Sequence, residues 1–194
     1  MAGEPISPDV ATAIGRGEFV LSLGRIVWKK GLDRLISALP TAPRARLVLA
    51  GDDPENHGAF LLREAARLNV SDRVTILPRH VEGADKERLF ASATAFAMPS
   101  LSENFGIAAV EAMRRGLPVL VTPEVGAAEL VRASGGGIVV TGEPAALAKG
   151  LDFLLADPVA ARAMGSTGCA YVSARYGWPS VAAKMEALYE SLLS

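Results

Sequence analysis

Six short apolar runs, each followed by a helical stretch, restrict the possible folds of this chain more than any other feature of its sequence. The runs cover residues 19–24, 46–51, 73–78, 95–100, 118–122 and 137–140. Each run is almost continuously apolar, which is typical of strands that are buried on both faces of a sheet. Because helical stretches separate the runs, successive strands should be parallel. The sequence therefore predicts an α/β fold, a Rossmann-like doubly wound parallel sheet of about six strands with helices on both faces.

The helical stretches between the runs carry apolar residues on one face. They are predicted at residues 31–39, 57–69, 85–93, 105–116 and 127–133. The remainder of the chain is predicted to be helical, over about 144–156, 158–174 and 179–193. The final helix carries a series of apolar residues, namely Trp178, Val181, Met185, Leu188 and Leu192.

These patterns suggest three segments. Residues 1–17 are rich in Gly and Pro and show no clear periodicity, so they are expected to form an N-terminal lead-in or a residual linker outside the core. Residues 18–175 should form the Rossmann-like domain. Residues 176–194 should form a helical C-terminal tail packed on that domain.

Composition excludes several classes of function. The formal net charge of −1 gives no global attraction to nucleic acid or to anionic lipid. No apolar run approaches the ~20 residues that span a bilayer, and no signal peptide is present, so we expect a cytoplasmic protein without membrane insertion. An enzyme that acts beside a membrane surface is compatible with this expectation. The single cysteine, Cys169, excludes an internal disulfide framework and a Cys-X-X-Cys redox motif, and a buried structural thiol is expected.

Ligands of doubly wound sheets bind beyond the carboxyl ends of the strands, so the polar residues that follow each strand are the first candidates for a site. After the first strand, Gly24 lets the backbone turn close to a ligand, and Arg25 and Lys30 place two cations at this edge. With a helix N-terminus nearby, they could hold a diphosphate. The alternative is a set of basic residues on a solvated loop. The pattern is neither a Walker loop nor Gly-X-Gly-X-X-Gly.

Two further turns carry polar residues. Asp52 and Asp53 follow the second strand, where a helix cap is favoured over a metal pair. Arg79 and His80 follow the third strand, where a solvated loop and a contact with a nucleobase edge both remain open. Neither histidine of the chain has a second metal ligand near it in the sequence, and no metal site is expected.

The segment after the fourth strand carries two acidic residues, Glu103 and Glu111, eight positions apart. Asn104, Phe105 and Gly106 form a turn that leads into a helix, where free amides would attract phosphate or sugar oxygens. Glu111 lies within that helix. It could accept hydrogen bonds from the two hydroxyls of a ribose, or it could form a surface pair with one of the arginines that follow, Arg114 or Arg115.

Taken together, these segments resemble a known family. "SLGRIVWKKG", "LVLAGD", "VTILP", "MPSLSENFGIAAVEAMRRGLPVLVT" and "GAAELV" are similar, in order and spacing, to the C-terminal domain of retaining glycosyltransferases of the GT-B fold, the glycosyl transferases group 1. The similarity runs from about Phe19 to Val140. Its most specific part is the Glu-X7-Glu element formed by Glu103 and Glu111, which the Gly24–Gly31 segment supports.

The resemblance implies a role for each candidate residue. Arg25 and Lys30 would hold the diphosphate of a nucleotide-sugar donor, and Glu111 would bind the ribose hydroxyls. Glu103 would lie beside the donor sugar, with the amides of Asn104, Phe105 and Gly106 bonding its hydroxyls or phosphate. The loop at Arg79 and His80 would line the base. The donor is a substrate, and the family usually needs no metal or other cofactor.

The resemblance also implies a missing partner. A full enzyme of this family carries an N-terminal acceptor-binding domain, whereas only about 18 residues precede the first strand here. We therefore expect a donor-binding domain with little or no turnover alone, whose tail helix would face the missing domain and be partly exposed. Two alternatives are a non-catalytic module of the same fold that binds a nucleotide or a protein, and a relative that resembles nucleotide-sugar epimerases.

Overall fold

The computed structural model describes residues 5–193 and contains one parallel sheet of six strands in the order β3-β2-β1-β4-β5-β6. The strands are β1 (Val20–Leu23), β2 (Leu47–Ala50), β3 (Val74–Leu77), β4 (Ala95–Met98), β5 (Val119–Val121) and β6 (Gly137–Val139). Every pair of neighbouring strands is parallel, and β1 pairs with both β2 and β4. The predicted fold class is confirmed.

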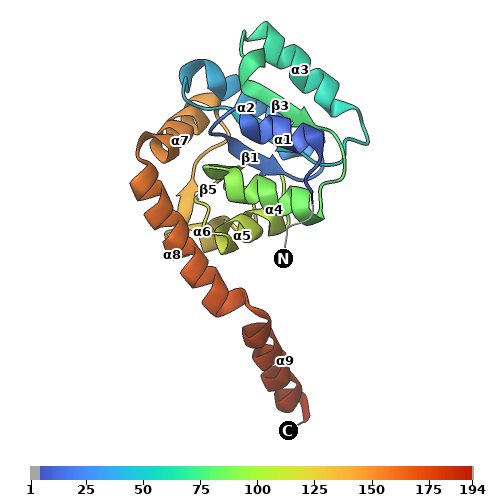
Figure 1. The fold of residues 1–194 in the computed structure, drawn as a ribbon. Coiled ribbons are helices and arrows are strands. Elements are labelled where there is room, and N and C mark those ends of the chain that lie inside the picture. Colours follow the sequence, from blue (N-terminus) through green and yellow to red (C-terminus); the bar gives the residue numbers. More distant parts are fainter. Residues whose placement is uncertain (1–4, 194) are drawn as a thin grey trace.

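Helices cover both faces of this sheet (Figure 1). They are α1 (Pro8–Gly15), α2 (Leu32–Ala38), α3 (His57–Arg67), α4 (Gly83–Ser92), α5 (Ile107–Arg114), α6 (Ala128–Ser134), α7 (Pro144–Ala156), α8 (Pro158–Tyr176) and α9 (Trp178–Leu193). Short 3-10 turns lie at η1 (Trp28–Lys30), η2 (Leu39–Thr41) and η3 (Ser71–Arg73). Within residues 5–193, no helix is both long enough and apolar enough to cross a membrane.

The core consists of two apolar layers, one on each face of the sheet. One layer contains buried residues of α1, α4, α5, α6 and α8, and the other contains buried residues of α2, α3 and α7. Successive residues of β1 contribute to opposite layers, since Val20 belongs to the second layer and Leu21 to the first. This alternation explains why the strands read as continuous apolar runs: both of their faces are covered.

The N-terminal segment corrects one sequence expectation. Residues 8–15 form α1, and Val10 and Ala13 are fully buried in the core, whereas the sequence analysis placed residues 1–17 outside it. Pro8 at the first helical position and Asp9 in the first turn both favour a helix start. The helix covers one end of the sheet through contacts with α4 and β3.

The last helix also differs from expectation. The tail was expected to pack on the domain, but Figure 1 shows α9 extending away from the sheet beyond the end of α8. Met185, Leu188 and Leu192 are 42%, 51% and 74% exposed, in keeping with the expectation of a partly exposed helix. The side chains of Trp178 and Val181 lie outside the described part of the structure. Cys169, on α8, is only partly buried, and its thiol donates a hydrogen bond to the carbonyl oxygen of Arg114.

Candidate functional site

The order of the strands changes direction between β1 and β4, because β1 leads through β2 to β3 while β4 leads through β5 to β6. Open α/β sheets bind their ligands outside the carboxyl ends of the strands at such a point. Two hollows of the described structure meet there, and both are lined by Leu23, Gly24 and Arg25. The location of the site is thus set by the topology of the sheet.

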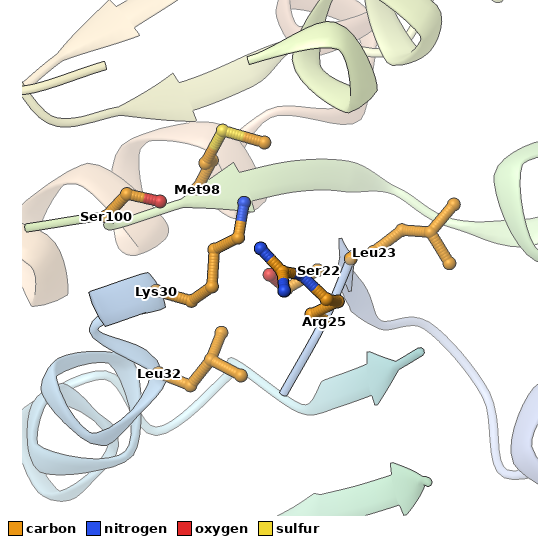
Figure 2. A pocket seen from close by; sticks show the side chains of 8 residues that line it. Ser22, Leu23, Arg25, Lys30, Leu32, Met98 and Ser100 are labelled. Carbon is orange, nitrogen blue, oxygen red and sulfur yellow. The ribbon is translucent and has the colours of Figure 1, made fainter. Parts of the chain in front are cut away.

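The first of these, the basic hollow, lies between the ends of β1 and β4 and has a cavity volume of about 10 Å³, room for about one water molecule (Figure 2). It is lined by Ser22, Leu23, Gly24, Arg25, Lys30, Leu32, Met98 and Ser100. Figure 2 shows the ammonium of Lys30 and the guanidinium of Arg25 pointing into the same space. Two cations therefore face one small volume, which favours an anionic ligand.

Lys30 is held at this position by close packing of two turns. Gly31, which follows η1, has a φ angle of 61°, and a Cβ atom there would lie only 2.4 Å from the carbonyl oxygen of Pro99. The amide of Leu101 donates a hydrogen bond of 2.8 Å to the carbonyl oxygen of Lys29. The turn after β1 and the turn after β4 are thus joined through their backbones beside the Lys30 side chain.

Glu103 forms an ion pair with Lys30, and the two side chains are about one-fifth exposed. The loop that carries Glu103 is itself fixed, because its amide donates to the carbonyl oxygen of Glu124 (3.1 Å) and its carbonyl oxygen accepts from the amide of Gly126 (2.9 Å). The structure therefore brings together Arg25, Lys30 and Glu103, which follow two strands distant in the sequence.

The second hollow, the wide hollow, opens beside the first and has a cavity volume of about 340 Å³, at the lower end of the range for ligand sites. It is lined by Leu23, Gly24, Arg25, Gly51, Asp52, His80, Val81, Lys86, Ile107, Ala108 and Glu111. Two carboxylates, a lysine and a histidine thus face a hollow that shares Leu23, Gly24 and Arg25 with the basic hollow.

Glu111 projects from α5 into the wide hollow and pairs with Lys86 of α4, whose Nζ lies 2.8 Å from Oε1 of Glu111. The alternative pairing with the following arginines is not what the structure shows. Arg115 binds the carboxylate of Glu87 and donates only to the backbone oxygen of Glu111. Sequence reasoning missed Lys86, which belongs to no motif. Its place in the first turns of the helix that follows β3 is the signal that could have identified it.

His80 also lines the wide hollow, with its Nδ1 atom 3.1 Å from Oδ2 of Asp52. The hydrogen bond with this carboxylate, together with its charge and that of Glu82, raises the pKa of His80. The neighbouring Asp53 accepts hydrogen bonds from the amides of His57 (2.7 Å) and Gly58 (2.9 Å), which confirms its interpretation as a cap of α3. Across residues 5–193, no group of three or more His, Cys, Asp or Glu side chains is placed to hold a metal ion.

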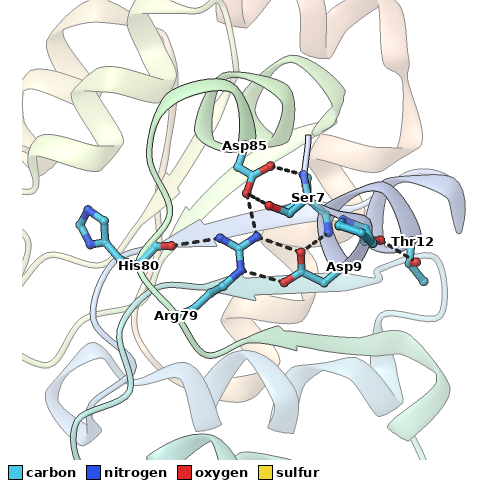
Figure 3. A network of polar contacts seen from close by, with 8 residues as sticks. Ser7, Asp9, Thr12, Arg79, His80 and Asp85 are labelled. Carbon is cyan, nitrogen blue, oxygen red and sulfur yellow. Dashed lines mark hydrogen bonds and ion pairs between the residues drawn. The ribbon is translucent and has the colours of Figure 1, made fainter. Parts of the chain in front are cut away.

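Arg79 does not line either hollow, contrary to the expectation that it lies along a nucleobase. Its guanidinium binds both oxygens of Asp9 at 2.8 Å and the carboxylate of Asp85 at 2.7 Å (Figure 3). Asp85 also accepts hydrogen bonds from the amide (2.8 Å) and the hydroxyl (2.7 Å) of Ser7. The hydrogen bond from Arg79 lowers the pKa of Asp9, while burial opposes the shift. For Asp85, burial opposes ionisation, but the hydrogen bonds from Ser7 and Arg79 outweigh it and lower the pKa. Arg79 thus ties α1 to α4.

The turn before α5 lies just beyond the wide hollow. Gly106, with a φ angle of 94°, precedes the first residue of α5, and Ile107 and Ala108 of the first helical turn line the hollow. Asn104 and Phe105 are not among its lining residues. The Phe105 ring instead lies 6.5 Å, centroid to centroid, from the ring of Tyr176 on α8. The start of α5 is therefore the part of this turn that faces the hollow.

Comparison with known proteins identifies a family and relatives of similar sequence. The sequence model of the family described as "Glycosyl transferases group 1" matches residues 7–169. The GDP-mannose-dependent alpha-(1-6)-phosphatidylinositol monomannoside mannosyltransferase of Mycobacterium tuberculosis is 33% identical over 192 residues, which cover 89% of this chain and 47% of that protein. This chain spans about half the length of the curated relatives that it matches.

Solved structures of glycosyltransferases have a similar fold. The structure of HepE from Anabaena in complex with UDP-glucose superposes with a TM-score of 0.82 at 27% identity, covering 95% of this chain and 53% of that one. The C-terminal domain of a glycosyl transferase group 1 protein from Francisella tularensis superposes with a TM-score of 0.73 at 18% identity, covering 89% of this chain and 93% of that one. The second likeness concerns the fold alone.

Proposed function

Because this chain belongs to the glycosyl transferases group 1 family and has the fold of its C-terminal GT-B domains, we propose that it is the donor-binding domain of a retaining glycosyltransferase. It would bind a nucleoside diphosphate sugar at the β1–β4 edge, with the diphosphate at the basic hollow and the nucleoside in the wide hollow. The observation that carries this proposal is that Arg25 lines both hollows, the first together with Lys30 and the second together with Glu111.

The charges match the parts of such a ligand. Arg25 and Lys30 would bind the diphosphate, and the start of α5 at Ile107 and Ala108 would add amide donors. The Glu111 carboxylate can accept two hydroxyl hydrogen bonds beside the one from Lys86, as a ribose diol requires. His80 and Asp52 would lie toward the base.

The chemistry follows from the same geometry. In glycosyl transfer the bond between the anomeric carbon and the diphosphate breaks, and the diphosphate leaves with growing negative charge. Arg25 and Lys30, fixed by the turns after β1 and β4, would stabilise that charge without having to reorganise. A phosphate that binds Lys30 would displace Glu103 from its ion pair, which would release this carboxylate toward the sugar.

The proposal includes a partner. Since this chain covers about half of its relatives, the acceptor would bind to a second domain, and the chain alone would show little or no turnover. Retention of the anomeric configuration would be a property of the complete enzyme. It is tested by expressing this chain together with the acceptor-binding domain and determining the anomeric configuration of the product by NMR.

Donor binding is tested on the chain itself by thermal shift with UDP-, GDP- and ADP-sugars. Because binding to the native state alone raises its stability, a ligand at about 100 times its Kd adds about 2.7 kcal/mol. For a chain of this size that corresponds to an increase in Tm of about 5–10 °C. If no nucleotide sugar at millimolar concentration raises Tm, donor binding is rejected and the alternative of a protein-binding module of the same fold is favoured.

A further inference from the structure

Ser100 has a buried hydroxyl that has no hydrogen-bond partner within the described structure. The residue is fully buried in the turn after β4, and its Oγ makes no hydrogen bond to any described residue. Ser100 nevertheless lines the basic hollow, and Figure 2 shows its hydroxyl oxygen and the Lys30 ammonium pointing toward the same space. A buried hydroxyl without a partner is costly, and in native proteins such a group calls for an explanation.

The backbone on both sides of this hydroxyl is fixed. The carbonyl oxygen of Ser100 accepts a hydrogen bond of 2.8 Å from the hydroxyl of Thr122, which is itself fully buried. The next amide, that of Leu101, is bonded to the carbonyl oxygen of Lys29. The backbone of Ser100 therefore cannot turn toward solvent without breaking these two hydrogen bonds, which keeps the residue at the hollow that holds Lys30.

The Lys30 ammonium can supply the hydrogen-bond partner that the Ser100 hydroxyl lacks. An ammonium group can donate three hydrogen bonds, and one of them is made to Glu103. When a phosphate replaces Glu103, the Lys30 side chain must remain at the end of β4 although its carboxylate partner is gone. A neutral acceptor beside the ammonium can hold it there without competing with the phosphate for charge.

We infer that Ser100 is a positioning residue for diphosphate binding: when a phosphate has displaced Glu103, the Ser100 hydroxyl accepts a hydrogen bond from Lys30 and holds the ammonium where the phosphate meets it. This inference rests on the proposed function, since it assumes that the ligand carries a diphosphate. Ser100 acts through Lys30 and forms no bond with the transferred group.

The test compares Ser100→Ala with wild type and with Ser102→Ala, a control for an exposed serine of the same loop. Affinities for UDP, GDP and ADP, and for the matching nucleosides without phosphate, are measured by calorimetry. Ser100→Ala should weaken diphosphate binding about tenfold, as expected for a hydrogen bond to a charged group. Nucleoside affinity should be unchanged, and Tm should be equal or higher, because the variant removes an unpaired buried hydroxyl. Ser100→Thr, which keeps the hydroxyl, should restore most of the affinity.

Each other result rejects the inference. Equal diphosphate affinity of Ser100→Ala and wild type would show that the hydroxyl does not act through Lys30. An equal loss of nucleoside and diphosphate affinity, with a lower Tm, would show a purely structural role. If wild type binds none of the diphosphates, the proposed function fails first, and the inference falls with it.

Discussion

The Lys86 ammonium of α4 and the Glu111 carboxylate of α5 lie 2.8 Å apart across the wide hollow. The pair joins helices that follow β3 and β4, which are not neighbours in the sheet. It orients the carboxylate while the remaining acceptor positions of the carboxylate face the hollow. This arrangement supports the proposed role of Glu111 as the acceptor of hydrogen bonds from the ribose hydroxyls.

Replacing Glu111 with Ala should remove recognition of the ribose. We expect wild type to bind a nucleoside diphosphate about tenfold more tightly than its 2′-deoxy form, and the variant to bind both equally weakly. Calorimetry with the two nucleotides measures the difference. Glu129→Ala, which changes an exposed carboxylate paired with Arg132 on α6, is the matched control and should behave as wild type. A variant that still discriminates between the two nucleotides would contradict the ribose role.

Replacing Lys86 with Met should reduce the preference for the ribonucleotide over its 2′-deoxy form, but less than Glu111→Ala does. The Glu111 carboxylate remains in this variant, and only its orientation is lost. Lys86→Arg keeps a cation at this position and should restore part of the preference for the ribonucleotide. The same pair of nucleotides provides the readout. If Lys86→Met keeps full discrimination, Lys86 does not position Glu111.

Replacing Lys30 with Gln should act on the phosphates and not on the nucleoside. Diphosphate affinity should fall by about tenfold or more, since a charge-assisted contact is lost, while nucleoside affinity stays the same. The salt dependence of diphosphate binding should also become weaker, because one cation is removed from the site. Lys149→Gln on α7 changes a lysine that lines neither hollow and serves as the control. Equal losses for nucleoside and diphosphate would argue against a phosphate contact.

The network around Arg79 should contribute to stability and should make it depend on pH. Asp85→Ala removes the acceptor of the Ser7 hydroxyl and amide and one of the acceptors of the Arg79 guanidinium, which keeps Asp9, and we expect a loss of about 1–3 kcal/mol. The pKa values of Asp9 and Asp85 are lowered in the folded state, so their contribution is present above their unfolded values, near pH 4, and is lost as the pH falls further. Urea denaturation between pH 3 and 7 should therefore show a smaller loss of stability toward low pH for Arg79→Met than for wild type. An identical pH dependence would show that the network does not lower these pKa values.

The sequence predicted the fold well because buried parallel strands carry a strong local signal. All six strands lie within the predicted ranges, since helices cover both faces of the sheet and its strands are therefore mostly apolar. Helix α1 was missed, because its apolar face is short and its stability depends on contacts with distant residues, including those of Arg79 with Asp9 and Asp85.

The candidate site was predicted only in part for a related reason. Arg25, Lys30, Glu103 and Glu111 could be placed together because they follow strands whose carboxyl ends share one edge. Lys86 and Ser100 could not, because their importance depends on which side chain faces them from another element. Arg79 follows a strand in the same way as Arg25, but the acidic residues of α1 and α4 direct it away from the hollow.

The most direct test of the account is to map nucleotide binding on the chain by NMR. Amide signals of the ¹⁵N-labelled protein would be followed during titration with a nucleoside diphosphate that raises its Tm. We predict saturable shifts that cluster at Gly24, Lys30 and Ala108, around the hollows at the ends of β1 and β4. Shifts that cluster instead at the opposite edge of the sheet, around Gly116 and Leu117, would contradict a donor site at the crossover of β1 and β4.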